Sequence, residues 1–282
     1  MKIALCVSGH LRNCDKTSTS FHWFREKLNT FATTDTFVCT WDKRNTINSW
    51  SGNKGFINEK TKNDEICEQY VCETYRTKNV IIFNQDFYNS EFSPLNYKDL
   101  TDKKYDYDEH GGNENVVYTS NAFFLMYNVN TLKKIKEFQT GEKYDLVIRI
   151  RPDFGFYADM SFEIFKSLDA KTLYTMKHFK NEEQVQIQDW IAFGDSDTMN
   201  KYLSAFLKFS SVFNSGLFGS SEKVLLGTHE NFTLFFKKEI DPIGCLNRDV
   251  GIVGIEAYQL DPLDAMNRNL PIHYYNRIGP VG

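Results

Sequence analysis

Short apolar runs alternate with longer amphipathic stretches along much of the chain. Apolar runs of about four to eight residues are typical of buried strands, whereas apolar residues at every third or fourth position indicate helices. The apolar runs predict strands at 3–7, 35–41, 79–83, 145–153, 173–176 and 190–193. The helical spacing predicts helices at 20–31, 64–75, 120–138 and 197–209, and another within 222–236. This alternation predicts an α/β fold whose central, mostly parallel mixed sheet is flanked by helices.

Three stretches lack this periodicity. Residues 42–64 are rich in Asn, Lys, Gly and Ser and are predicted to form a mobile loop. Residues 84–115 are polar and rich in tyrosine, and a stretch of this length is either a functional lid or partly disordered. The tail from Asp261 is expected to be mostly irregular. The chain has 282 residues and no internal repeat or linker-like segment, which favours one domain over 1–282.

The composition narrows the class of protein. Apolar residues make up 41% of the chain and the net charge is −4, which argues against intrinsic disorder and against nucleic-acid binding through a bulk positive field. No apolar segment reaches the roughly 18 residues that span a bilayer. The six cysteines form no C-x-x-C pair, and Cys6 and Cys39 lie in apolar runs, so we expect buried thiols and a cytoplasmic location. The 24 phenylalanines predict a core built from Phe instead of Leu.

The strand at 145–153 carries the clearest candidate chemistry. Its apolar start predicts a central, buried strand, and Arg149, Arg151 and Asp153 follow at alternate positions. If the extended geometry continues, all three side chains point to the same side of the sheet. Guanidinium groups suit phosphate oxygens, and buried ones are costly unless they meet anions. An internal cluster of Arg–Asp ion pairs is the structural alternative.

The loop after the first strand supplies a matching set of residues: Ser8, Gly9, His10, Leu11 and Arg12. It lies in the same layer if strands 3–7 and 145–150 are parallel, because ligands of open α/β sheets bind beyond the carboxyl ends of the strands. Gly9 allows close approach of the backbone, and Arg12 suits phosphate. His10 either stacks on or hydrogen-bonds a ligand, or is a satisfied loop histidine.

Carboxylates later in the chain are candidates for acid–base chemistry. Asp189 precedes an apolar run and adjoins Trp190, an environment that tunes a carboxylate or lets it hold a sugar hydroxyl. Glu222 is a second candidate, although it also fits the first turn of a helix capped by a serine. Ser196 or Asp197 is expected to cap the helix at 197–209. Five aromatic residues are candidates for stacking on a sugar or for ordinary packing: Trp41, Trp50, Tyr105, Tyr107 and Trp190.

Five motifs occur in one order over residues 1 to about 230: S-G-x-L-R, D-T-F-V-C-T-W, Y-D-L-V-I-R-I-R-P-D, D-W-I-A-F-G-D-S-D-T-M-N-K-Y and S-E-K-V-L. In these motifs the chain resembles glycosyltransferase-like proteins of bacterial polysaccharide clusters and large DNA viruses. That family is assigned to the GT-A (nucleotide-diphospho-sugar transferase) fold. The resemblance implies transfer of a sugar from a nucleotide-diphosphate sugar to a glycan or other acceptor hydroxyl. It also implies a nucleotide-binding part at about 1–155, an acceptor-side part at about 156–282, and the host cytoplasm as the location if the protein is viral.

The resemblance implies roles for the candidate residues. The R-P-D segment stands where GT-A enzymes carry Asp-x-Asp, a motif that holds a divalent metal on the donor diphosphate. Here Arg151 replaces the first carboxylate, so Asp153 alone is left as a metal ligand, and participation of Mn²⁺ or Mg²⁺ stays open. The implied donor-binding residues are Ser8, Gly9, His10, Arg12, Arg149, Arg151 and Asp153. Asp189 is the expected catalytic base, with Glu222 behind it.

Two other classes of function are compatible with these residues. The first is a non-catalytic carbohydrate- or nucleotide-binding module on a degenerate transferase scaffold. The second is a sulfate- or phosphate-group transferase, which would use the arginines. The chain has no G-x-x-x-x-G-K-[S/T] loop, which places the second class last.

Overall fold

The computed structural model describes residues 1–11, 14–43, 65–92, 112–156, 162, 165–166, 173–177 and 187–207. Its centre is a six-stranded mixed sheet with the order β3-β2-β1-β4-β6-β5. The strands are β1 (Lys2–Ser8), β2 (Thr33–Trp41), β3 (Asn79–Phe83), β4 (Leu146–Ile150), β5 (Tyr174–Lys177) and β6 (Ile187–Gly194). Strands β1 to β4 are parallel, whereas β6 is antiparallel to both β4 and β5. The expected α/β class with a mostly parallel sheet flanked by helices is confirmed.

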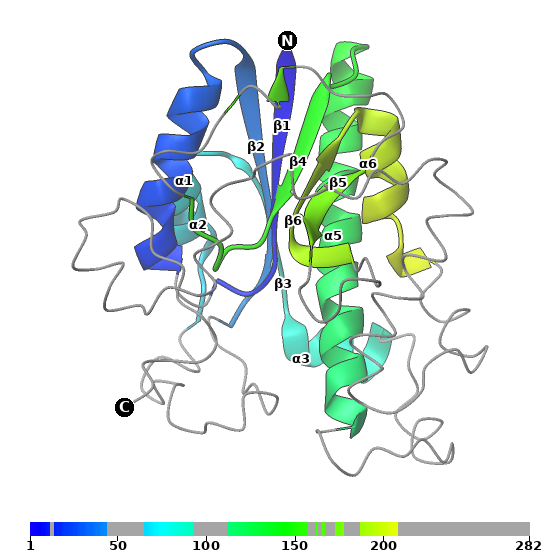
Figure 1. Cartoon of the computed structure of the whole chain (residues 1–282). Coiled ribbons are helices and arrows are strands. Elements are labelled where there is room, and N and C mark those ends of the chain that lie inside the picture. The colour runs from blue at the N-terminus through cyan, green and yellow to red at the C-terminus, as the bar shows by residue number, and fades with distance from the viewer. Residues whose placement is uncertain are drawn as a thin grey trace.

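Helices cover both faces of the sheet (Figure 1). One face carries α1 (Cys14–Leu28) and α2 (Glu68–Tyr75), and the other carries α5 (Gly112–Thr140) and α6 (Ser196–Leu203). Two short helical segments, α3 (Gln85–Phe87) and η2 (Tyr88–Phe92), follow β3. None of the helices in these described ranges is long and apolar enough to cross a membrane.

Alternation along β1 divides the core into two layers. Ile3, Leu5 and Val7 pack with the apolar residues of α1 and α2. Ala4 and Cys6 face the layer that contains α5 and α6, where their small side chains leave room for the long helix. Aromatic rings fill both layers, and the Phe24 and Phe156 rings stack with centroids 3.9 Å apart. The core among the described residues is thus rich in phenylalanine, but it contains leucine as well, so Phe does not replace Leu as predicted.

The predicted buried thiols are confirmed as well. Cys6 and Cys39 are free and buried. Burial raises the pKa of the Cys6 thiol to about 12 and that of Cys39 well above its ordinary value. Neither thiol is therefore a thiolate near neutral pH.

Two sequence predictions about local structure are wrong. The strand at 145–153 ends at Ile150, because Pro152 has no N–H for the ladder and Pro152 and Asp153 form a turn in which Phe154 N donates to Arg151 O (2.9 Å). In the stretch 84–115, α3 and η2 occupy 85–92 and α5 begins at Gly112, whereas 93–111 lie outside the described residues, so the lid or partial disorder stays a prediction. Asp195 caps α6 by accepting from Thr198 N, so neither Ser196 nor Asp197 is the cap. The predictions for 44–64, 222–236 and the tail lie outside the described residues.

Candidate functional site

The order in which the strands are added to the sheet reverses at β1, which is where a ligand site is expected in an open α/β sheet. The chain moves from β1 to β2 and β3 on one side, whereas β4 lies on the other side of β1. In open α/β sheets ligands bind beyond the carboxyl ends of strands at such a switch point. The parallel register pairs Val7 with Ile150. The first loop and the segment that follows β4 therefore leave the sheet side by side.

Gly9 lies close to the segment that follows β4. Its φ of 140° is a conformation that side chains rarely adopt, and a Cβ there would lie 3.0 Å from Pro152 Cδ and 3.3 Å from Arg151 Cγ. Gly9 N donates to Cys39 O (3.3 Å), and Thr40 Oγ1 donates to Gly9 O (2.9 Å). The loop is thus held by β2 on one side and lies against the Arg151–Pro152 segment on the other.

Arg149 is buried at the end of β4, with 1% of its surface exposed. Its Nε donates to Ser8 Oγ (3.1 Å) and its Nη2 donates to Ser8 O (3.2 Å). Ser8 therefore fixes the guanidinium group beside the first loop. Because a guanidinium stays protonated even when buried, this places a permanent positive charge at the switch point.

Arg151 and Asp153 form an ion pair across the Pro152 turn, through Nε and Oδ1. Their side chains are 7% and 5% exposed. Thr17 Oγ1 of α1 donates to Pro152 O (2.6 Å) and anchors the turn. The ion pair that was the structural alternative is thus present, and Arg151 also borders Gly9. Binding of a phosphate by Arg149 and Arg151 stays a prediction.

The described residues do not fit a divalent cation. Nowhere in them do three His, Cys, Asp or Glu side chains form a cluster that could hold a metal ion. Mg²⁺ and Mn²⁺ prefer several oxygen ligands, whereas Asp153 is a single carboxylate engaged by a guanidinium. Metal binding by Asp153 would need ligands from the rest of the chain and stays a prediction.

The structure describes less of the other expected site residues, Asp189, Arg12, Glu222 and His10. The backbone of Asp189 lies in β6, two residues before Ile191, which pairs with Ile150, so Asp189 enters the sheet at the edge where β4 ends. Arg12 and Glu222 lie outside the described residues. His10 is partly exposed, and its ring centroid lies 6.4 Å from that of Trp41. The roles of these residues stay predictions.

Trp41 was a candidate for stacking on a sugar, but its surroundings are those of a core residue. The residue has no exposed surface, and its ring stacks on Phe124 with centroids 5.7 Å apart. Tyr88 and Phe83 contact the same ring. Trp41 therefore belongs to the core, where it cannot offer a face to a sugar. Trp50, Tyr105 and Tyr107 lie outside the described residues, and Trp190 lies in β6.

Sequence reasoning missed two polar residues of α5 near the same edge. Ser120 and Asn121 are 0% and 1% exposed. Within the part of the chain that the structure describes, the Ser120 hydroxyl and both polar atoms of the Asn121 carboxamide make no hydrogen bond. The sequence does contain a sign of Asn121. It lies at a spacing of four from the apolar Leu125 and Val129, and a polar residue at such a position of a helix is unusual.

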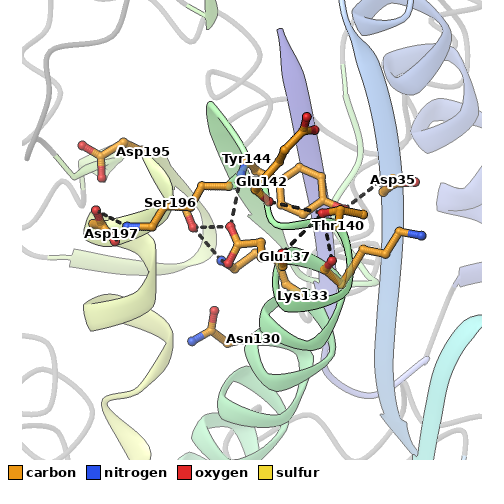
Figure 2. A network of polar contacts seen from close by, with 12 residues as sticks. Asp35, Asn130, Lys133, Glu137, Thr140, Glu142, Tyr144, Asp195, Ser196 and Asp197 are labelled. Carbon is orange, nitrogen blue, oxygen red and sulfur yellow. Dashed lines mark hydrogen bonds and ion pairs between the residues drawn. The ribbon is translucent and has the colours of Figure 1, made fainter.

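A second buried polar cluster lies on the same face of the sheet, near the amino ends of β2 and β4 (Figure 2). Lys133 Nζ pairs with Glu137 Oε2 (2.8 Å) and donates to Ser196 Oγ (2.7 Å). Ser196 Oγ and Tyr144 N both donate to Glu137 Oε1, at 2.6 and 3.1 Å. This cluster, called here the Lys133 network, joins α5 to α6 and to Tyr144, two residues before β4.

Comparisons with known proteins bear on the fold. No family model matches the chain, and neither does any curated protein. Among solved structures, the chain is similar to the galactosyltransferase LgtC in complex with donor and acceptor sugar analogs, at 10% identity and a TM-score of 0.35, over 81% of this chain and 70% of that one. It is similar to mouse xyloside xylosyltransferase 1 at 9% identity and a TM-score of 0.43, over 88% and 86% of the two chains. It is also similar to the glycosyltransferase GlyE of Streptococcus pneumoniae at 9% identity and a TM-score of 0.42, over 100% of this chain and 56% of that one.

Proposed function

We propose that this chain is a glycosyltransferase that moves a sugar from a nucleotide-diphosphate donor to a glycan or another acceptor hydroxyl. The observation that carries the proposal is the position of Arg149 and Arg151. Both guanidinium groups are buried at the switch point of the sheet, beside the loop of Gly9, which lies against Arg151 and Pro152. This combination of charge and place suits a diphosphate.

The arginines would supply most of the electrostatic catalysis. Transfer breaks the bond between the anomeric carbon and the diphosphate oxygen, and the negative charge that develops goes to the departing diphosphate. Ser8 holds Arg149 and Asp153 holds Arg151, so the guanidinium groups are oriented before the donor binds. Preoriented charges of this kind stabilise a transition state without further reorganisation.

An acceptor hydroxyl must lose its proton as its oxygen bonds to the anomeric carbon. For an inverting reaction we assign this proton to the Asp189 carboxylate, with Glu222 as the second candidate. Support for Asp189 comes from its backbone position in β6, at the edge of the sheet where β1 and β4 also end.

Binding of nucleotides to the full chain tests the proposal. A panel of UDP, GDP and dTDP and their sugar conjugates, with and without Mn²⁺, is expected to raise the unfolding temperature of the wild type. A ligand at 100 times its Kd stabilises by about 2.7 kcal/mol. Arg151→Ala is expected to abolish this shift, whereas the control Arg25→Ala is not, because Arg25 lies in the last turn of α1 and donates to Tyr75 O. A wild type that responds to no nucleotide would contradict the proposal.

A non-catalytic binding module is the second candidate, and one observation favours it. Asp153 is engaged by Arg151, which stands where the resemblance expects the first carboxylate of Asp-x-Asp, so the metal-holding part of a GT-A site is altered. Hydrolysis or transfer of a radiolabelled donor sugar separates the two. For a transferase, Asp189→Asn is expected to bind the donor with unchanged affinity and to lose turnover. For a binding module, the wild type already shows no turnover.

A further inference from the structure

Ser120 and Asn121 form a buried polar pair whose hydrogen-bonding capacity is unused among the described residues. The exposed fractions of the two side chains are 0% and 1%, and the Asn121 carboxamide has neither its donor nor its acceptor occupied there. Buried polar groups in native proteins are nearly always hydrogen-bonded. Such a side chain on an otherwise apolar stripe therefore requires a reason, and a ligand group is one.

The position of the pair follows from the helix that carries it. Helix α5 packs on β1 and β2 and runs opposite to them (Figure 1). Phe124 stacks on Trp41, the last residue of β2. Asn121 lies about one turn nearer the start of α5, and helical side chains point toward that end. Asn121 therefore lies beyond Trp41, on the side of the sheet where β1 and β2 have their carboxyl ends.

The chemistry of the pair differs from that of the neighbouring arginines. A carboxamide and a hydroxyl are neutral, and each both donates and accepts hydrogen bonds. Neutral groups that donate and accept match the adjacent hydroxyls of a sugar ring, whereas a phosphate needs donors alone.

We propose that Asn121, with Ser120, hydrogen-bonds two adjacent hydroxyls of a sugar ring in the nucleotide sugar whose diphosphate binds at Arg149 and Arg151. This inference rests on the proposed function and assigns its specificity to α5. Adjacent hydroxyls occur both in the transferred sugar and in the ribose of the nucleotide, and the experiment below distinguishes the two.

If Asn121 serves a ligand and not the fold, its replacement by an apolar residue should stabilise the ligand-free chain. Replacing an unpaired buried polar group by an apolar group of similar shape removes its desolvation cost. Asn121→Leu is therefore expected to raise the unfolding midpoint of the ligand-free chain, by about 2–4 °C. A loss of stability or a failure to fold would contradict the proposal, because it would show that Asn121 serves the fold.

Calorimetric titration of the full chain measures the binding side. The probes are the nucleoside diphosphate that binds best in the panel above, its 2′-deoxy analogue and its sugar conjugate. Asn121→Leu is expected to weaken binding of the sugar conjugate about 10- to 100-fold, since a ligand hydroxyl loses its partner in a buried site. Ser120→Ala is expected to act in the same direction with a smaller change.

The three probes identify which ring is bound. If the pair binds the transferred sugar, Asn121→Leu leaves the affinity for the bare diphosphate unchanged. If it binds the ribose, the variant weakens the diphosphate as well and no longer distinguishes it from the 2′-deoxy analogue. Either result supports the proposal.

Asn130→Leu is the matched control on the same helix. Asn130 is also 1% exposed and its Oδ1 likewise makes no hydrogen bond within the described residues, but its Nδ2 lies 3.4 Å from Ser204 Oγ, and the residue is about 13 Å farther along the helix axis. Its replacement is expected to leave all three affinities unchanged. If Asn121→Leu binds every probe as the wild type does, the inference is wrong while the proposed function stands. If the wild type binds no nucleotide, the proposed function fails first.

Discussion

The two polar clusters on the α5 face of the sheet are built on opposite principles. In the Lys133 network, near the amino ends of β2 and β4, the lysine and the glutamate balance each other, and Ser196 and Tyr144 complete the hydrogen bonds of the carboxylate. Near the carboxyl ends of β1, β2 and β4, Arg149 binds Ser8 and Arg151 pairs with Asp153, while Ser120 and Asn121 have unused polar atoms among the described residues.

This difference separates a cluster that serves the fold from one that we propose binds a ligand. A buried ion pair with its hydrogen bonds completed holds α5 and α6 in one arrangement. Buried polar atoms without a hydrogen bond, such as those of Asn121, cost stability in the absence of a ligand and recover it on binding. Mutations in the first cluster should therefore change stability alone, whereas mutations in the second should change binding as well.

Removing Glu137 is expected to give the largest change in stability. Glu137→Ala leaves Lys133, whose side chain is fully buried, without its counter-charge. Loss of one partner of a buried pair typically costs about 3–5 kcal/mol of unfolding free energy. Chemical denaturation measures the change, with the exposed Lys134→Ala as control. The nucleotide affinity of the fraction that folds is expected to stay at the wild-type value, and a change of affinity would contradict the separation of the two clusters.

Replacing both partners of the pair sharpens the same test. The double variant Lys133→Met, Glu137→Leu removes both charges and retains apolar volume. Such replacements of buried pairs are often neutral or stabilising. We therefore expect the double variant to recover most of the stability that Glu137→Ala loses, and a double variant as unstable as the single one would show that the network acts through more than its charges.

Two glycines with positive φ offer an intermediate test, one near each cluster. Gly9 has a φ of 140° and would place a Cβ 3.0 Å from Pro152 Cδ, whereas Gly141 has a φ of 69° and open space around its Cβ. Gly9→Ala is expected to cost about 1–3 kcal/mol and to weaken nucleotide binding, because the loop must move away from Arg151. Gly141→Ala is expected to cost about 1 kcal/mol through backbone strain alone.

Denaturation and nucleotide titration of both glycine variants measure these effects. Equal affinity for nucleotide in Gly9→Ala and the wild type would mean that the first loop does not contribute to the site. Weaker binding in Gly141→Ala would mean that the two ends of the sheet are coupled.

Much of the fold could be predicted from the sequence because its strands are short apolar runs with clear boundaries. β3 begins and ends where the run at 79–83 does, and the parallel arrangement of the first and fourth strands placed the first loop beside the R-P-D segment. The Lys133 network could not be predicted. Lys133 and Glu137 are spaced as an ordinary pair on an exposed helical face, and only the packing of α6 buries them.

The candidate site was predictable only in part, for two physical reasons. The alternation that was to align Arg149, Arg151 and Asp153 requires an extended strand, and the turn at Pro152 instead lets Arg151 pair with Asp153. Asn121 escaped notice because a sequence does not show whether a buried amide has a partner. That property depends on every neighbour in space, and it emerges only when the helix is placed on the sheet.

The pH dependence of stability is the smallest expected difference between the clusters. Hydrogen bonds from Lys133, Ser196 and Tyr144 N outweigh the opposing effect of burial and lower the pKa of Glu137 below its ordinary value of 4.5. A carboxyl whose pKa is lower in the folded state stabilises the fold above its unfolded pKa, and this contribution is lost as the pH falls through the folded value. Denaturation of the wild type and Glu137→Gln at a series of pH values is therefore expected to show curves that converge below about pH 4.5. Curves that stay parallel across this range would mean that the carboxylate is not the charged partner of Lys133. The Lys133 network would then not be a balanced ion pair, and its contrast with the candidate ligand site would lose its basis.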